Sequence, residues 1–126
     1  MKKIRGSLAI VFIMLFTTAT FAASSRSVVL NGGSYVAEGS LVRDSGTGRV
    51  TAVTKKVSGN IHVGTGVSVV DKTYGVIHLD VRVEKNTSTR SYIPPYAIED
   101  TIGAESEHGA YTIYGVQLDR TRLYLP

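Results

Sequence analysis

Hydrophobic and polar residues alternate along much of this chain with the period of two that is typical of β-strands. The clearest case is residues 74–85, in which four aliphatic side chains alternate with four polar ones. The aliphatic positions are Ile77, Leu79, Val81 and Val83, and the polar positions are His78, Asp80, Arg82 and Glu84. This pattern predicts a strand with one face toward a core and the other toward solvent.

Shorter segments of the same kind are separated by turn residues. We predict strands at residues 28–30, 34–43, 49–57, 61–63, 67–71, 111–118 and 123–125. Gly39 is a candidate β-bulge within the second of these segments. Because no stretch has a sustained helical period, about seven or eight short strands predict an all-β fold, a single small antiparallel sandwich or barrel.

Two segments near the C-terminal end do not fit this strand pattern. Pro94 and Pro95 cannot donate backbone hydrogen bonds, so residues 93–96 are expected at a sheet edge or in a connection. Residues 99–108 are polar and acidic, and they predict a loop or one helical turn.

The first 22 residues have the pattern of a secretory signal peptide. Basic residues precede an apolar run at residues 8–16, and small residues follow at Thr20 and Ala22. The run is shorter than the roughly 20 residues of a membrane-spanning helix, although an uncleaved N-terminal anchor is the alternative. We expect a single β-rich domain at residues 23–126 that does not span a membrane. Its expected location is the periplasm, the outer membrane or the exterior of a bacterial cell.

The charge of the chain changes when the predicted signal peptide is removed. The full chain has 14 basic and 10 acidic residues, a net charge of +4. Three basic residues lie in the predicted signal, which leaves 11 basic against 10 acidic residues and a net charge of +1. Lys55-Lys56 is the only adjacent basic pair in this domain, so binding of nucleic acid is disfavoured. The absence of cysteine excludes disulfides and a lipoprotein anchor.

One seven-residue pattern occurs twice, as GSYVAEG at residues 33–39 and GAYTIYG at residues 109–115. Each copy has glycine, a small residue, tyrosine, three further residues and glycine. We expect each copy to open a strand after a turn, and the two hairpins to pack in related places.

Two clusters of polar residues could hold a metal ion. His78 and Asp80 project from the same face of the predicted strand, and His62 could complete a site from another strand. Glu105, Glu107 and His108 could hold calcium, but their spacing matches no EF-hand loop. The alternative for both clusters is a solvated surface, and we predict neither metal nor cofactor.

No catalytic motif is present in the sequence. No serine lies in a G-x-S-x-G motif, and no phosphate-binding glycine loop precedes a helical pattern. The paired carboxylates are neighbours in one segment, whereas a glycosidase needs two that face each other across a cleft. A Ser–His–Asp triad is recognised by geometry and is left open by the sequence. We expect a protein that is not an enzyme.

Tyrosine is a good anchor for binding, because it combines a large apolar area with a polar tip. Tyr92, Pro94, Pro95 and Tyr96 form a candidate contact loop, in which the two prolines would hold both tyrosines rigidly. The alternative is that these tyrosines cover the edges of a sheet.

Parts of the sequence resemble the C-terminal domain of outer-membrane secretins. VIHLDVRV at residues 76–83, the prolines and HGAYTIYGVQL at residues 108–118 follow an order similar to that family. RSVVLNGGSYVAEGSLVRD at residues 26–44 is similar to the second part alone. The resemblance covers about half of residues 23–126 and implies a small relative or accessory of a secretion channel, without the large N-terminal domains of secretins.

The composition also resembles that of chaperone–usher fimbrial subunits. Those subunits are secreted sandwiches rich in Val, Thr and Gly, with a tyrosine near the end, as at Tyr124 here. This chain lacks their cysteine pair. The resemblance implies a structural part of a pilus.

Taken together, the sequence predicts an exported bacterial cell-envelope protein that acts by binding protein. The expected role is an accessory or structural component of a surface assembly, a pilus or a secretion channel. Its partners would be envelope or surface-assembly proteins, bound by strand addition to an exposed sheet edge, and self-association is left open. The alternative is a small periplasmic or secreted binding protein or enzyme inhibitor that presents the candidate contact loop.

Overall fold

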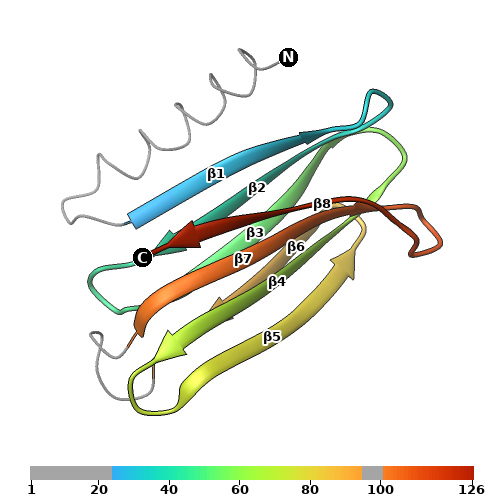
Figure 1. The fold of residues 1–126 in the computed structure, drawn as a ribbon. Coiled ribbons are helices and arrows are strands. Elements are labelled where there is room, and N and C mark those ends of the chain that lie inside the picture. Colours follow the sequence, from blue (N-terminus) through green and yellow to red (C-terminus); the bar gives the residue numbers. More distant parts are fainter. Residues whose placement is uncertain (1–23, 95–100) are drawn as a thin grey trace.

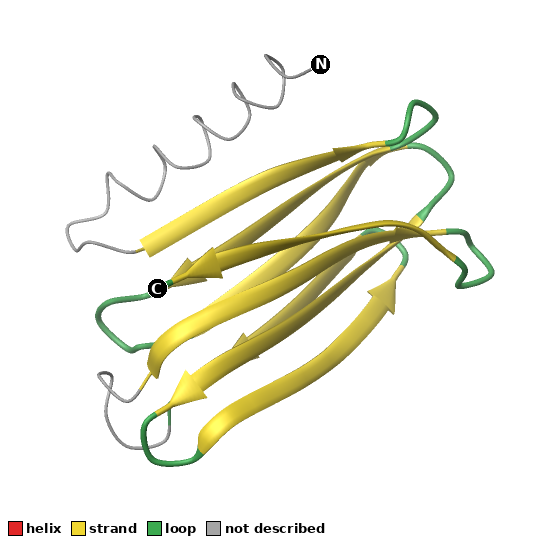
Figure 2. Cartoon of the chain, in the orientation of Figure 1, coloured by secondary structure: helices red, strands yellow, loops and turns green. Residues whose placement is uncertain are grey.

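A computed structural model describes residues 24–94 and 101–126, which form eight β-strands (Figures 1 and 2). The strands are β1 (Ser24–Asn31), β2 (Val36–Arg43), β3 (Val50–Ser58), β4 (His62–Asp71), β5 (Gly75–Glu84), β6 (Thr87–Tyr92), β7 (Thr101–Tyr111) and β8 (Gln117–Leu125). In these ranges no helix has the length and apolar character that a membrane crossing needs. The predicted signal peptide lies outside the described residues.

The strands form two four-stranded sheets that pack face to face as a sandwich (Figure 1). The first sheet has the order β1-β2-β3-β6 and the second has the order β5-β4-β7-β8. Every pair of neighbouring strands is antiparallel. The prediction of an all-β antiparallel fold is therefore confirmed, and of the two predicted architectures the chain adopts the sandwich.

Four predicted segments differ from the structure in kind or in continuity. The predicted strands at 61–63 and 67–71 are parts of one strand, β4, which begins at His62. The prediction of a loop or helical turn at residues 99–108 is wrong where the structure describes them, because β7 pairs with β4 and β8 on its two sides. The predicted strand at residues 111–118 is wrong as well, since a turn separates β7 from β8 there.

The core consists of two apolar clusters with a polar layer between them. The first cluster contains Leu41, Val50, Ala52, Val67, Val69, Ala104 and Leu125. The second contains Leu30, Tyr35, Ala37, Ile61, Val63 and Ala110. The polar layer, which lies between the clusters along β4 and β7, contains Thr54, Thr65, Ser88, Ser106 and His108. The layer joins the sheets by hydrogen bonds, because Thr54 and Ser88 belong to the first sheet and the others to the second.

The alternation predicted for residues 74–85 holds for only part of β5. Ile77 and Leu79 pack against the first apolar cluster, as predicted. Opposite Gly66, β5 then carries two residues, Asp80 and Val81, because the register of β4 and β5 shifts there. This irregularity changes the phase of the alternation, so that Arg82 faces the buried Thr65 on the side of the core.

The two copies of the repeated pattern adopt different structures. GSYVAEG leads into β2 as predicted, but GAYTIYG ends β7 and forms the following turn, so the expectation for the second copy is wrong. Gly39 is not a bulge either, since the register of β2 shifts between Val36 and Ala37. Gly39 instead leaves room for the His108 ring, because an added Cβ would lie 2.6 Å from its Cγ atom.

Candidate functional site

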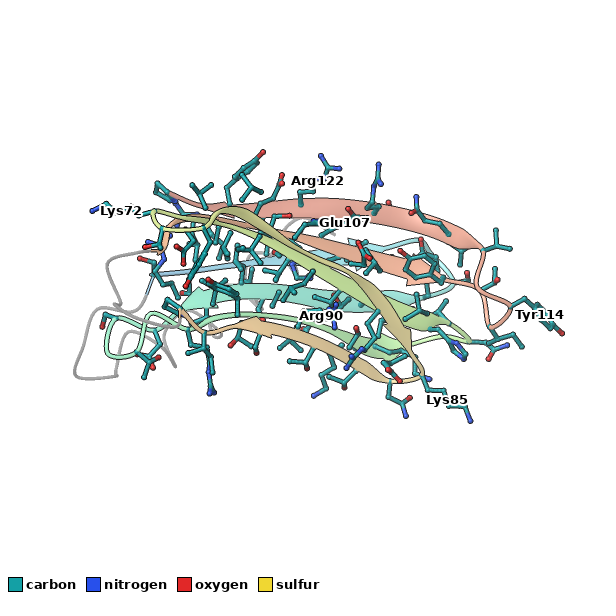
Figure 3. All side chains as sticks on the ribbon, turned by 90° about the horizontal axis from the view of Figure 1, so that it is seen from below. Lys72, Lys85, Arg90, Glu107, Tyr114 and Arg122 are labelled. Atoms are coloured by element: carbon teal, nitrogen blue, oxygen red, sulfur yellow. The ribbon has the colours of Figure 1, made fainter. Side chains whose placement is uncertain are left out.

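Among the described residues, the turn between β7 and β8 is the short segment with the largest group of exposed apolar side chains. Tyr114 is 88% exposed and projects from one end of the molecule, opposite the end that carries Lys72 (Figure 3). Its neighbours Ile113, Val116 and Leu118 are also exposed. We call these four residues, Ile113, Tyr114, Val116 and Leu118, the hairpin tip. Scattered exposed apolar residues are ordinary, but four within six positions form a patch that can contact another molecule.

Hydrogen bonds hold the hairpin tip in one conformation. The Thr112 amide donates to the Val116 carbonyl at 2.8 Å, and the Gly115 amide donates to the Thr112 carbonyl at 2.9 Å. The Thr112 hydroxyl accepts from the amides of Tyr114, at 3.3 Å, and Val116, at 3.0 Å. Gly115 has a φ of 88°, a value that residues with a Cβ rarely adopt, so the turn depends on glycine there.

A second tyrosine anchors the base of this hairpin. Tyr111, three residues before Tyr114, is only 8% exposed, and its ring packs over the backbone at Gly64 and Gly109. Burial raises the pKa of Tyr111, and Glu107 raises it further while Arg120 lowers it. One tyrosine therefore fixes the hairpin to the second sheet and the other is presented to solvent.

The sequence-based interpretation missed the hairpin tip as a surface. It assigned residues 111–118 to a strand, in which alternate side chains would be buried. The available signal was Thr112 followed by Gly115, a polar residue and a glycine at the spacing of a tight turn.

The candidate contact loop has a different environment from the one expected. Tyr92 is half-buried, packs against the first apolar cluster and donates its hydroxyl to Asp71 Oδ2 at 2.8 Å. Pro94 is buried, whereas Ile93 between them is 53% exposed. Pro95 and Tyr96 lie outside the described residues.

Asp71 organises the end of the sandwich where this loop begins. Its Oδ1 atom accepts hydrogen bonds from the amides of Thr73 at 2.8 Å and Tyr74 at 3.0 Å. Burial acts to raise the pKa of Asp71, but the hydrogen bonds from Tyr92, Tyr74 and Thr73 hold that pKa below its usual value. Tyr92 therefore has a structural partner and is not a free anchor.

The candidate metal-binding residues do not form the two clusters that the sequence suggested, although His78 and Asp80 are neighbours. His62 faces Tyr111 and His78 faces Ser68, and these positions on β4 are six residues or about 20 Å apart. Of the second cluster, Glu105 and Glu107 lie on the outer face of the second sheet, whereas His108 is buried between the sheets. Within residues 24–94 and 101–126, no three His, Cys, Asp or Glu side chains are close enough to share a metal ion.

A serine, a histidine and an aspartate do form a hydrogen-bonded chain on the outer face of the second sheet. Ser68 Oγ lies 2.7 Å from His78 Nδ1, and His78 Nε2 lies 3.2 Å from Asp80 Oδ1. The His78 and Asp80 side chains are 61% and 92% exposed, so water weakens both contacts. Ser68 lies within β4, whose amides pair with β5 and β7, and a triad needs amides that are free to stabilise an oxyanion.

A shallow depression of about 70 Å³ lies beside this chain of residues. Its polar lining comes from Ser68, His78, Glu105, Glu107 and Arg122, and Gly66 leaves space on the sheet surface. Small-molecule sites usually enclose about 300–1,000 Å³, so this depression is far too small to enclose a substrate.

A second serine–histidine pair lies inside the polar layer. Ser106 Oγ lies 2.5 Å from His108 Nε2, and Thr54 Oγ1 lies 2.8 Å from His108 Nδ1. Both Ser106 and His108 are at most 1% exposed, so no substrate can reach them. Burial lowers the pKa of His108 to about 4, although a hydrogen bond with the Val53 backbone acts in the opposite direction. This imidazole is neutral and structural.

The hydroxyl partners of this histidine are hydrogen-bonded in turn to each other and to the backbone. Thr54 Oγ1 donates to the Gly64 carbonyl at 3.0 Å, and Thr65 Oγ1 lies 2.6 Å from Thr54 Oγ1 and 2.9 Å from the Ser88 carbonyl. His108, Ser106 and the two threonines therefore form one buried hydrogen-bonded network that joins the two sheets.

Comparisons with known proteins add little to this geometry. No protein-family model matches the chain, and a search of curated protein sequences found no match. Among solved structures, it is similar to part of the crystal structure of endonuclease/exonuclease/phosphatase from Beutenbergia cavernae DSM 12333. That similarity has a TM-score of 0.46 and 12% identity, over 81% of this chain and 27% of that chain. A likeness at this level supports no conclusion about activity.

Proposed function

We propose that this protein acts by binding another protein, and that the hairpin tip is its contact surface. The observation that carries the proposal is a group of exposed apolar side chains on a hydrogen-bonded turn, led by the 88% exposed Tyr114. A tyrosine held on a rigid turn offers a large contact area and loses little conformational entropy on binding. The depression beside Ser68 is too small to enclose a substrate, and the Ser68–His78–Asp80 chain is open to water, so both features favour binding over catalysis.

The partner we propose is a protein of the bacterial cell envelope. In this proposal the chain is exported and serves as an accessory or structural component of a surface assembly, such as a pilus or a secretion channel. The support for export is the signal-peptide pattern of residues 1–22. The resemblance of residues 76–83 and 108–118 to secretins supports the kind of assembly.

Photo-crosslinking in cells tests this proposal. A photoreactive phenylalanine analogue replaces Tyr114 in one variant and Tyr74 in the matched control, which is 51% exposed at the opposite end of the sandwich. After irradiation, adducts are separated by cell fractionation and identified by mass spectrometry. We expect adducts with envelope proteins from position 114 and few from position 74. Equal labelling from both positions would contradict a role for the hairpin tip.

The alternative function is a small periplasmic or secreted inhibitor that uses the candidate contact loop. Ile93 is the exposed residue of its described part, so the same photoreactive residue at position 93 tests it. Adducts with one soluble enzyme from position 93, and none with envelope proteins from position 114, would replace the proposed function with this one.

A further inference from the structure

The second sheet ends in two strands that each have one free edge. β5 pairs only with β4, and β8 pairs only with β7, within the part of the chain that the structure describes. A free strand edge readily accepts another strand unless it is protected. Because the four strands alternate in direction, β5 and β8 are antiparallel to each other. A second copy placed alongside in the same orientation would bring its β5 antiparallel to β8 of the first.

We propose that copies of this chain bind one another head to tail, with β8 of one copy paired to β5 of the next. The register we propose sets Arg122 opposite Asp80 of the next copy, and so sets Leu123 opposite Leu79 and Tyr124 opposite His78. Opposite residues of an antiparallel pair lie on the same face of the sheet. This register meets that condition, since Leu123 and Leu79 face the core and the other four residues face outward.

The apolar side chains at these two edges are incompletely covered in a single copy. Ile77, Leu79 and Leu123 are only partly buried against the first apolar cluster, because they lie at the open sides of the sandwich. Pairing β8 with β5 of the next copy would bring Leu123 onto Leu79 and bury both. It would also cover Tyr124, which is 66% exposed on the outer face.

The charges of the two edges are complementary. On β8, Arg120 and Arg122 both contact the Glu107 carboxylate, at 3.4 and 3.9 Å, and their side chains remain 46% and 53% exposed. Figure 3 labels Arg122 and Glu107. On β5, Asp80 is 92% exposed and its neighbour His78 is charged only when protonated. A two-fold pairing about the middle of β8 would instead set arginine against arginine. An ion pair between Arg122 of one copy and Asp80 of the next therefore favours contact of β8 with β5 over contact of β8 with β8.

The first sheet differs from the second at its edges. Arg26 on β1 faces Leu41, and Arg90 on β6 faces Ala52, so both arginines are on the side of the core. Inward-pointing charges on edge strands are a common means of preventing strand addition. In the second sheet, the core-facing places that the proposed register uses, Ile77, Leu79 and Leu123, are apolar. Farther along the same two edges, Arg82 faces Thr65 and Asp119 faces Ala110 on the side of the core. Strand addition to the second sheet is therefore favoured at the end of the two edges where the proposed register lies.

This self-association goes beyond the proposed function, because it uses a different surface from the hairpin tip. A contact between two unlike edges leaves a free β5 at one end and a free β8 at the other. Such a contact closes only if the rotation between copies forms a ring, and otherwise it extends into a filament. A protein that binds an envelope partner through its hairpin tip could therefore also form a row of copies.

Disulfide crosslinking tests the proposed pairing cleanly, because the chain has no cysteine of its own. Two variants carry one cysteine each, Asp80→Cys or Arg122→Cys, and a third carries both. Within one copy β5 and β8 are separated by two strands, or about 14 Å, which is too far for an internal disulfide. We expect the mixture of the two single variants to form dimers on oxidation, and the double variant to form a ladder of longer products.

Two outcomes would overturn the proposal. Dimers from either single variant alone, without a ladder from the double variant, would show a two-fold contact instead. No crosslinked product from folded protein at rising concentrations would show that the edges do not meet. Tyr114→Ala should remove contacts of the hairpin tip and leave the ladder unchanged, so failure of this inference and failure of the proposed function are distinguishable.

Charge exchange gives a second test that does not depend on cysteine. Arg122→Asp should weaken self-association in sedimentation velocity, because it sets aspartate against aspartate. Adding Asp80→Arg in the same chain should restore it, since the pair is then reversed. Loss of association in the exchanged double variant, with an unchanged melting temperature, would count against the proposed register.

Discussion

At the scale of single residues, His108 has the environment with the clearest thermodynamic consequence. Its ring is fully buried between the sheets, and both nitrogens have hydroxyl partners from Thr54 and Ser106. Protonation would place a charge in the core, which is why burial lowers the pKa of His108 from about 6.5 to about 4. In the unfolded chain the same imidazole takes up its proton at a higher pH.

This difference predicts that the protein loses stability as the pH falls from about 6.5 to about 4. In that window the unfolded chain binds a proton that the folded chain does not, so the free energy of unfolding decreases as the solution becomes more acidic. The loss of unfolding free energy attributable to His108 is about 3 kcal/mol at about pH 4, the acidic end of this window. Above about pH 6.5 His108 causes no loss. Urea unfolding at a series of pH values measures it.

The matched control is His108→Gln, which keeps a hydrogen-bonding side chain and cannot titrate. We expect this variant to be less stable at pH 7 and to have a flatter dependence on pH between 4 and 6.5. The solvent-accessible His78 remains in both proteins, so its contribution cancels. An unchanged slope in the variant would show that another group is responsible.

At the scale of elements, the turn between β7 and β8 makes a prediction about local order. Thr112→Val keeps the shape of the side chain but removes the oxygen that accepts from the Tyr114 and Val116 amides. Both amides can bind water instead, so we expect a loss of only about 0.5–1 kcal/mol in global stability. Hydrogen exchange should become faster at these two amides. Unchanged exchange would show that the hydroxyl does not hold the turn.

The predictability of the strands from sequence depended on what their core-facing side chains are. In β5, Ile77 and Leu79 are aliphatic, and the alternation was visible. In β7, the core-facing residues Ala104, Ser106, His108 and Ala110 alternate with Glu105, Glu107 and Gly109. The core-facing residues are themselves small or polar, so the segment resembles a loop. A buried histidine becomes acceptable only with the hydroxyls of Thr54 and Ser106 in place, and contacts between strands cannot be seen in a linear pattern.

The candidate site was less predictable than the fold for a related reason. Tyr92 and Tyr114 are the same residue type in similarly apolar surroundings in the sequence. One is half-buried because Asp71, 21 residues earlier, accepts its hydroxyl, and the other is exposed because Gly115 turns the chain beside it. Exposure of a tyrosine is therefore decided by tertiary contacts and by one backbone dihedral angle, neither of which follows from composition.

At the scale of the whole molecule, the two apolar clusters should contribute independently to stability. Val63 and Val69 are both at most 1% exposed, but they belong to different clusters, about 20 Å apart along β4. We expect each change to alanine to cost about 2 kcal/mol, and the double variant to cost the sum to within about 0.5 kcal/mol. Urea denaturation of the four proteins checks this, and a larger coupling energy would show that the polar layer transmits strain.

The polar layer also has a consequence for how the two sheets are aligned. Apolar attraction has no direction, and two surfaces of valine and alanine could pack in several offsets of similar energy. Hydrogen bonds from Thr54 to the Gly64 carbonyl and from Thr65 to the Ser88 carbonyl form at only one offset, and every other would leave buried donors unpaired. The polar layer therefore fixes the offset between the two sheets, and the molecule folds to a single packed arrangement.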